Sequence, residues 1–183
     1  WKTGHSHMKR RVKELGALAG FEKSGHYFLS GEIGHGYDCG MRVAVEICKL
    51  MDRSPDMSLP DLRKALPKTW ATSTMSPYCS DLEKYGTLDR LVAKLVAKFK
   101  AGEKLGGRPI KKVVTANGAR VILDNGAWGL VRASSNTPNL VVVCESPESD
   151  AEMRAVFEDI DAVIRTESNV GEIRPDYLMA QRL

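Results

Sequence analysis

One polar segment, Arg132-Ala133-Ser134-Ser135-Asn136-Thr137-Pro138, concentrates the side chains that bind anions. An arginine can hold a phosphate through two parallel hydrogen bonds, and hydroxyls, amides and loop N–H groups supply further donors. The segment contains no carboxylate that would repel an anion. Its residue types are also those of an ordinary hairpin loop, so the pattern alone leaves both an anion cradle and a plain turn open.

A second polar tip, Glu22-Lys23-Ser24-Gly25-His26, lies between two short apolar runs. Glu22 offers a carboxylate acceptor, Ser24 a hydroxyl, and His26 an imidazole that exchanges protons near neutral pH. These groups suit a ligand that carries several hydroxyls. The residues alone also allow a solvated loop, in which Glu22 pairs with Lys23 and His26 caps a strand.

Two further histidines form an H-x-H pair, His5 and His7, which could bind a metal with His26 or His35 as a third ligand. Residues two apart on a helix point away from each other, and no acidic or cysteine cluster with ligand spacing lies nearby. We therefore expect no metal ligands in this chain.

The composition indicates a packed protein. Of 183 residues 43% are apolar, and 27 basic residues against 23 acidic ones give a net charge of +4, which excludes the disordered and disulfide-dense classes. No run reaches the ~18 apolar residues of a membrane span, so no membrane partner is expected. The cysteines are widely spaced, which predicts free thiols in a reducing, cytoplasmic compartment, with Cys48 and Cys144 buried.

A lysine-rich stretch follows the middle of the chain and could bind nucleic acid. Its basic residues are Lys94, Lys98, Lys100, Lys104, Arg108, Lys111 and Lys112. Nearby acidic residues dilute this charge, and no aromatic residues for base stacking are interleaved with it. We predict a solvated face and no nucleic-acid partner.

Hydrophobic spacing predicts the elements that hold the first half together. Residues 6–15 form a short basic helix, and residues 18–21 and 27–29 form two strands that flank the Glu22–His26 tip. Residues 37–53 are apolar nearly all round, which predicts a buried helix.

The stretch 54–76 is rich in Pro, Ser and Thr, with one short helical piece near residues 59–66. This composition is typical of a linker, and we place a domain boundary near Thr72. The predicted domains are therefore residues 1–72 and 73–183.

The second half alternates in a way that predicts a small sheet. Apolar residues between 88 and 99 recur three and one positions apart, as on one face of a helix. Strands are predicted at 113–116, 119–123, 127–132 and 139–145; Asn-Gly pairs, which favour antiparallel hairpins, separate the first three. A last helix is expected to begin with Ser146 as its N-cap. We predict an α+β fold with a four-stranded antiparallel sheet and two helices packed on one face.

Four motifs in order resemble the C-terminal portion of the α-D-phosphohexomutase family, most closely its bacterial phosphomannomutase/phosphoglucomutase branch. Residues 1–6 are similar to the family's W-K-T-G-H-S segment, and residues 21–26 to its sugar-recognition loop G-E-M-S-G-H. Residues 37–40 correspond to F-D-D-G, and residues 128–138 to the phosphate loop W-G-L-V-R-A-S-x-x-T-P.

The resemblance implies that residues 1–72 are the end of a third, α/β domain and that residues 73–183 are a fourth, phosphate-binding domain. The implied activity interconverts hexose 1-phosphate and 6-phosphate, of mannose or glucose, through a phosphoserine enzyme and a bisphosphorylated sugar. The residues that it implies for phosphate binding are Arg132, Ser134, Ser135, Asn136 and Thr137. Glu22 and Ser24 would bind sugar hydroxyls, while His26 and His5 would face the reacting hydroxyl.

The family's phosphoserine and Mg²⁺ loop lie in its first two domains, so we interpret this chain as a fragment that is inactive alone. The expected cofactors of the whole enzyme are Mg²⁺ and hexose 1,6-bisphosphate. The expected partners are the hexose phosphate substrate and the missing N-terminal domains. Phe21, Lys23 and Cys39 depart from the family motifs, which leaves the preferred sugar open. The alternative is a stand-alone module that binds anions or nucleic acid.

Overall fold

The computed structural model describes residues 1–173 and the backbone of residues 181 and 182, and these residues divide into two compact units. The first unit is Trp1–Leu66 and the second is Pro67–Leu183. The division lies a few residues before the predicted boundary near Thr72. Residues 67–72 go with the second unit because Trp70 and Ala71 form a strand of its sheet.

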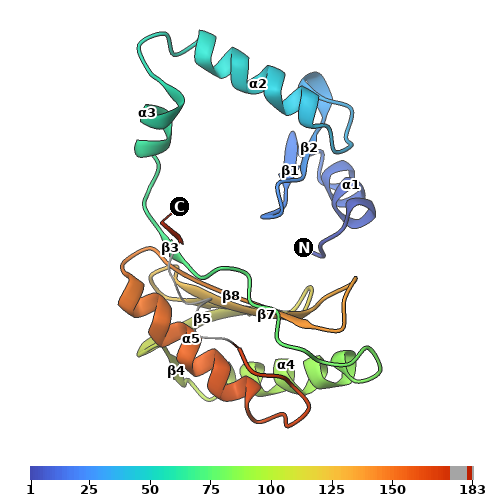
Figure 1. Cartoon of the computed structure of the whole chain (residues 1–183), viewed down its shortest axis with the longest axis vertical. Coiled ribbons are helices and arrows are strands. Elements are labelled where there is room, and N and C mark those ends of the chain that lie inside the picture. Colours follow the sequence, from blue (N-terminus) through green and yellow to red (C-terminus); the bar gives the residue numbers. More distant parts are fainter. Residues whose placement is uncertain (174–180, 183) are drawn as a thin grey trace. The chain divides into compact units, whose positions relative to one another are not determined.

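The elements of the first unit are α1 (His5–Glu14), β1 (Ala19–Phe21), β2 (Tyr27–Leu29), the 3-10 turn η1 (Gly31–Ile33), α2 (Gly40–Asp52) and α3 (Leu59–Lys64). Helices α1 and α2 lie beside the hairpin of β1 and β2, and α3 lies apart from it (Figure 1). Strands β1 and β2 pair antiparallel, with Phe21 opposite Tyr27, so the Glu22–His26 tip is the turn between them, as predicted.

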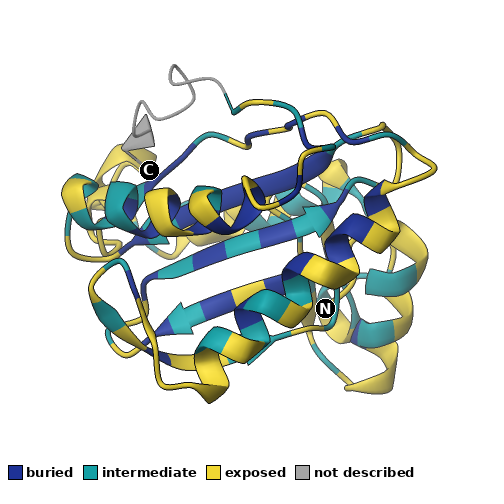
Figure 2. Ribbon diagram, turned by 90° about the horizontal axis from the view of Figure 1, so that it is seen from below, coloured by how far each residue is buried: buried dark blue, intermediate teal, exposed yellow. Residues whose placement is uncertain are grey.

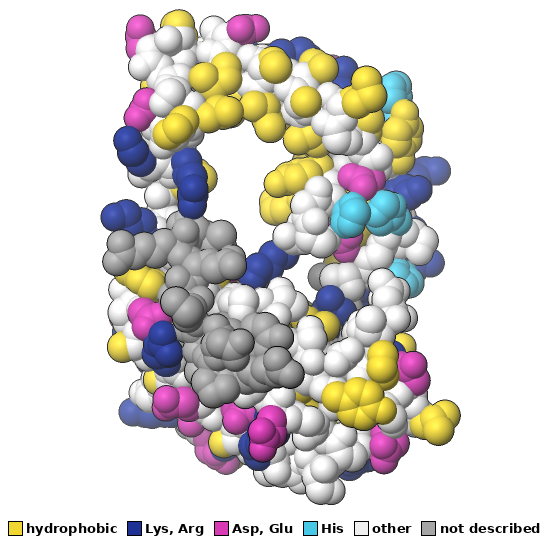
Figure 3. Space-filling model, viewed as in Figure 1, with side chains coloured by type: hydrophobic (Ala, Val, Ile, Leu, Met, Phe, Trp, Pro, Cys, Tyr) yellow, Lys and Arg dark blue, Asp and Glu magenta, His cyan; other side chains and the backbone are white. Residues whose placement is uncertain are grey.

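The prediction that the helix of residues 37–53 is buried is wrong. In α2, Met41 is 84% exposed, and Val45, Ile47 and Leu50 are exposed as well. Figure 3 shows hydrophobic side chains gathered over this helix. Within residues 1–66 only two hydrophobic side chains, Val12 and Phe28, are buried, because the few other elements of this unit leave most of α2 without a neighbour.

The second unit contains a large antiparallel sheet with the strand order β4-β5-β6-β7-β8-β3-β9. Its long central strands are β5 (Arg108–Val114), β6 (Ala119–Leu123), β7 (Trp128–Ala133) and β8 (Leu140–Ser146). Both Asn-Gly turns occur as predicted, because Gly118 and Gly126 adopt φ values of +76° and +94° that favour glycine. Buried and less buried residues alternate along β6 and β7, which places one face of each strand in the core.

The predicted sheet of four strands is therefore too small. Three two-residue strands extend it: β4 (Lys104–Leu105) beyond β5, and β3 (Trp70–Ala71) and β9 (Gln181–Arg182) beyond β8. Strands this short show no alternation that a sequence pattern could reveal. Strand β5 also starts before the predicted residue 113, at Arg108, because its first residues pair with β4.

Two helices cover one side of this sheet, α4 (Lys84–Lys100) and α5 (Asp150–Ile164), as predicted (Figure 1). Helix α5 begins later than predicted: Ser149, not Ser146, is its N-cap, and the Ser149 side chain accepts a hydrogen bond from the Glu152 N–H. In Figure 2 the buried positions run along the strands and recur along both helices. Their shared core includes Leu91, Leu95 and Ile160, all fully buried.

Within the described residues no helix is long and apolar enough to cross a membrane. The cysteines show no disulfide there: Cys79 and Cys144 are buried, and burial raises the pKa of the Cys144 thiol to about 12. Cys48, expected to be buried, is exposed because it lies on the open helix α2.

Candidate functional site

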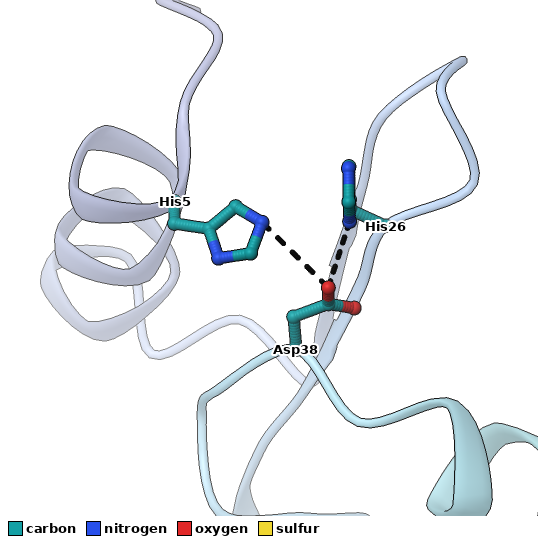
Figure 4. Close-up of side chains that lie close together, drawn as sticks. All are labelled: His5, His26 and Asp38. Carbon is teal, nitrogen blue, oxygen red and sulfur yellow. Dashed lines mark hydrogen bonds and ion pairs between the residues drawn. The ribbon is translucent and has the colours of Figure 1, made fainter.

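In the first unit, three titratable side chains from three separate segments meet (Figure 4). His26 at the start of β2 shares a hydrogen bond of 2.7 Å between its Nδ1 and Oδ2 of Asp38. His5, the first residue of α1, lies with its Nε2 3.6 Å from the same carboxylate oxygen. The two imidazole rings stand edge to face, with centroids 4.7 Å apart. The result is a carboxylate shared by two histidines.

The backbone around this cluster fixes the carboxylate. The Tyr27 N–H donates to Oδ1 of Asp38 at 3.0 Å, and Asp38 pairs with Phe28 in an isolated antiparallel bridge. Asp38 is thus bound to the hairpin through both carboxylate oxygens. The hydrogen bond from His26 is the largest cause that lowers the pKa of Asp38, and the Tyr27 N–H bond adds to it. Asp38 therefore stays ionised and leaves the Nε2 atom of His26 as the ring nitrogen that points away from it.

The sugar-binding candidates lie on the same hairpin. Glu22 accepts a hydrogen bond of 2.8 Å from the Gly4 N–H, which ties the segment before α1 to the tip of the β1–β2 turn. The turn is closed by the Gly25 N–H to the Glu22 carbonyl, and Gly25 has a φ of +86°. Ser24 is exposed at this tip. The structure therefore brings His5, Glu22 and His26 into one neighbourhood.

The His5, His26 and Asp38 donor atoms lie within 4.8 Å of one another, close enough for one metal ion to bridge them. His7 and His35, considered as ligands from the sequence, are not part of this group. The donor set of two imidazoles and one carboxylate does not fit Mg²⁺, which prefers oxygen ligands in an octahedron. His26 and Asp38 are joined directly by a hydrogen bond.

The phosphate-binding candidates lie in the second unit, on the loop between β7 and β8. Three donors of this loop converge on one oxygen, the Ser134 Oγ: the Asn136 N–H at 3.3 Å, the Thr137 N–H at 3.2 Å and the Thr137 hydroxyl at 2.8 Å. The Ser134 N–H bonds to the Asn139 carbonyl at 2.9 Å and closes the loop base. These bonds make a compact Ser/Thr turn, and the loop carries no carboxylate that would repel an anion.

Arg132 is the last but one residue of β7 and is half-buried, with its Nη1 donating to the Ala133 carbonyl at 3.0 Å. The Asn117-Gly118 turn lies in close contact with this end of β7. A Cβ added at Gly118 would lie 2.1 Å from the Val131 carbonyl oxygen and 2.7 Å from the Arg132 Cα. The Asn117-Gly118 turn thus supports the strand end that carries the arginine. Ser135 and Asn136 are exposed in the same loop.

The segment before α4 binds the outer side of this loop. The Cys79 N–H donates to the Pro138 carbonyl at 2.9 Å, the Leu140 N–H to the Pro77 carbonyl at 3.0 Å, and the Asn139 side chain to the Ser76 carbonyl at 2.9 Å. The end of the predicted linker, Ser76, and the residues directly after it therefore hold the candidate phosphate loop in place.

Sequence reasoning missed two residues of these groups. The sequence marked Asp38 only as part of the match to F-D-D-G. It lies two residues before a helix and twelve after His26, and this spacing gave no signal that the two side chains are in contact. Lys84 was not noted at all. It is the first residue of α4, is buried, and donates to the Thr137 carbonyl at 3.0 Å.

The predicted lysine face is partly neutralised by acidic partners. Lys94 pairs with Glu167 at 2.5 Å, and Lys98 pairs with Glu103 at 2.6 Å. Glu167 also binds Arg90 at 2.8 Å, which lowers the pKa of Glu167. These ion pairs fit the expected solvated face better than a surface built for nucleic acid.

Two family models match consecutive parts of the chain. The phosphoglucomutase/phosphomannomutase alpha/beta/alpha domain III matches residues 1–70, and the phosphoglucomutase/phosphomannomutase C-terminal domain matches residues 79–163. The two matches fall on the two compact units.

Individual proteins give the same result. A phosphomannomutase/phosphoglucomutase of Pseudomonas syringae pv. tomato is 33% identical over 96% of this chain and 33% of its own length. One of Pseudomonas putida is 34% identical over 85% of the chain and 30% of its own length. A crystal structure of a phosphoglucomutase/phosphomannomutase family protein from Burkholderia thailandensis matches with a TM-score of 0.73 and 27% identity, over 94% of this chain and 33% of that one. The chain thus spans about a third of the length of the relatives it matches.

Proposed function

This chain belongs to the phosphoglucomutase/phosphomannomutase family, and from that premise we propose that it forms the sugar-binding and phosphate-binding part of a phosphohexomutase. The whole enzyme would interconvert the 1-phosphate and 6-phosphate of mannose or glucose through a phosphoserine and a bisphosphorylated sugar. The phosphoserine and the Mg²⁺ loop would come from other domains of the same protein, and Mg²⁺ would neutralise charge on the transferred phosphoryl group there.

The observation that carries this proposal is the convergence of three donors on the Ser134 Oγ in a loop without a carboxylate. A phosphate bound in the loop would accept hydrogen bonds from the Asn136 and Thr137 N–H groups and from the Ser134 and Thr137 hydroxyls. These bonds would replace the internal bonds to the Ser134 Oγ. Arg132 would add charge-assisted hydrogen bonds, each contributing about 1.5–3 kcal/mol. The loop would hold the phosphate that is not reacting.

The first unit would handle the sugar hydroxyl that attacks or leaves the phosphoryl group. As the sugar oxygen bonds to phosphorus, the bond from phosphorus to the serine oxygen would break. The proton of the sugar hydroxyl would pass to the Nε2 of His26, and the serine oxygen would take up a proton from an acidic group or a water beside it in the other domains. Asp38 would stabilise the resulting imidazolium through Nδ1, and the proton would return in the reverse step. Glu22 and Ser24 would bind the neighbouring sugar hydroxyls, and His5 would place a second imidazole beside the reacting group.

The test is a titration of the chain with mannose 1-phosphate and glucose 6-phosphate, followed by amide chemical shifts. We expect saturable shifts centred on residues 132–137, and smaller ones with inorganic phosphate. Arg132→Gln should weaken binding by tenfold or more, on the order of one lost charge-assisted contact. Arg154→Gln removes the same charge from α5, where Arg154 pairs with Asp150, and should leave the affinity unchanged.

A short DNA duplex completes this experiment. If DNA shifts the amides along the lysine face while both sugar phosphates leave residues 132–137 unmoved, the mutase proposal is wrong and the binding-module alternative stands. A steep dependence on salt would identify that binding as contact with the DNA backbone.

A further inference from the structure

Lys84 is a charged side chain buried in the second unit, with only 4% of its side chain exposed. Lysine is almost never fully buried unless its ammonium group is paired. Here the Nζ donates to the Thr137 carbonyl at 3.0 Å and lies 2.5 Å from Oδ1 of Asp81. It also lies 5.3 Å from the centre of the Tyr85 ring, within the range of a cation–π contact. The ammonium group is therefore held by partners on several sides.

The residue that Lys84 contacts carries two of the three converging donors of the loop. The Thr137 N–H and hydroxyl donate to the Ser134 Oγ. The Thr137 carbonyl, which belongs to the next peptide unit, accepts from Lys84 and, at 2.8 Å, from the Asn139 N–H. Because this carbonyl and the Thr137 N–H are joined through one Cα, holding the carbonyl restricts the backbone torsions of Thr137 that orient its donors, although Lys84 is 53 residues away in sequence.

The ion pair between Lys84 and Asp81 is unequal in its exposure to solvent. The Asp81 side chain is 65% exposed, whereas that of Lys84 is 4% exposed. Solvent screens an exposed charge strongly and a buried one weakly, so the positive charge acts on the loop more than the negative charge does. The carboxylate still reduces the net positive potential beside Thr137.

We propose that Lys84 is a positioning residue for the loop 132–137 and that the Lys84–Asp81 pair sets how tightly this loop binds a phosphate monoester. Lys84 orients the Thr137 donors and contributes buried positive charge, and Asp81 limits that charge so that the phosphate can be released. The inference rests on the proposed phosphate-binding role of this loop.

The experiment titrates inorganic phosphate into the full 183-residue chain at about 0.15 M salt and follows the amides of Ser134, Asn136 and Thr137. Lys84→Met should weaken binding about tenfold, since it removes both a charge and the partner of the Thr137 carbonyl. Asp81→Asn keeps an oxygen that accepts from Lys84 but removes the negative charge, and should tighten binding about threefold. Asp89→Asn makes the same change of charge further along α4 and should have no effect.

The opposite effects of the two variants separate this proposal from a merely structural lysine. If Lys84 only supported the fold, loosening its ion pair in Asp81→Asn would leave phosphate affinity unchanged or reduce it. Equal affinities for wild type, Asp81→Asn and Asp89→Asn would overturn the inference, even if Lys84→Met fails to fold. If phosphate does not shift the amides of Ser134, Asn136 and Thr137 in the wild type, both the proposed function of the loop and this inference are wrong. If the wild type binds phosphate but Asp81→Asn does not change the affinity, only this inference is wrong.

Discussion

The two units of this chain differ in how far they bury their own hydrophobic residues. In the second unit, side chains from β5, β6, β7, β8, α4 and α5 form one continuous core that includes fully buried residues from every one of these elements except β5. In the first unit only Val12 and Phe28 are buried, while Met41, Phe21 and Leu15 are 60–84% exposed. Most apolar residues of the sheet and helices of the second unit thus find partners within that unit, whereas most of those of the first do not.

This difference bears on function. The candidate phosphate loop lies on a unit that is complete as a packed structure. The His5–His26–Asp38 cluster lies on a unit whose apolar helix α2 exposes most of its hydrophobic side chains. This helix lies within residues 1–70, which match domain III of the family.

The strongest test of this contrast separates the units. Residues 67–183 should fold alone, with dispersed amide signals and one cooperative thermal transition. Residues 1–66 should show neither, because burial of two hydrophobic side chains does not offset the entropy of ordering a chain. A cooperative transition of residues 1–66 in isolation would contradict the contrast.

Two substitutions measure the same contrast at single residues. Leu95→Ala in α4 removes a fully buried side chain and should lower the free energy of unfolding by about 2–5 kcal/mol. Ile47→Ala in α2 removes a side chain that is 41% exposed and should change it by less than about 0.5 kcal/mol. Urea denaturation of the full chain gives both values, and comparable losses for the two would show that α2 is packed.

Close packing around the phosphate loop is tested at two similar turns. Gly118 and Gly126 both follow an asparagine and both have positive φ, but only at Gly118 would a Cβ meet other atoms, 2.1 Å from the Val131 carbonyl. Gly126→Ala should cost about 1 kcal/mol for its backbone strain, and Gly118→Ala about 1–2 kcal/mol more. Urea denaturation followed by tryptophan fluorescence gives the free energy of unfolding of both variants. Equal losses would show that strand β7 shifts to accommodate the added Cβ at little energetic cost.

The smallest expected effect concerns Asp38 in the first unit. Its pKa should lie below the ordinary value of 3.8, chiefly because His26 donates to it, and His26→Gln should raise that pKa. A group with a lowered folded-state pKa stabilises the fold above its unfolded pKa, and this contribution is lost as the pH falls through the folded value. Carbon NMR of the carboxyl group measures the shift. His7→Gln is the control, and an equal response to both variants would remove His26 as the cause.

The sequence predicted the sheet well where periodicity carries information. Alternation and the two Asn-Gly pairs indicated β6 and β7 almost to the residue, and spacing indicated α4. The sequence did not predict that the apolar side chains of α2 are exposed. A run of apolar residues indicates a hydrophobic helix, but it does not show whether other elements pack against that helix. Strands of two residues, such as β3 and β4, are too short for any period.

Residue types and family motifs predicted most residues of the candidate site. The sequence did not predict which of these residues contact one another. Glu22, His26 and the loop 132–137 stand in positions where their types already suggested chemistry. Asp38 and Lys84 act through partners 12 and 53 residues away, and neither has a local pattern. Residues 168–171 show no clear pattern in the sequence, but Val170 joins the core of the second unit and the Gly171 N–H donates to the Tyr78 carbonyl at 2.8 Å. Residues 174–180 and 183 of the same tail lie outside the described residues.

Strand β3 also determines where this protein can be shortened without harm. The Thr72 N–H and hydroxyl oxygen bond to the Cys144 carbonyl and N–H, at 2.9 Å and 3.0 Å, next to the pairing of Trp70 and Ala71 with β8. A chain that starts at residue 73 would lose these bonds and leave the Cys144–Ser146 end of β8 without its partner, whereas Met75 would still pair with Val142. Unpaired strand edges recruit strands from other molecules, so a cut at the compositional boundary should increase aggregation relative to a cut at residue 67.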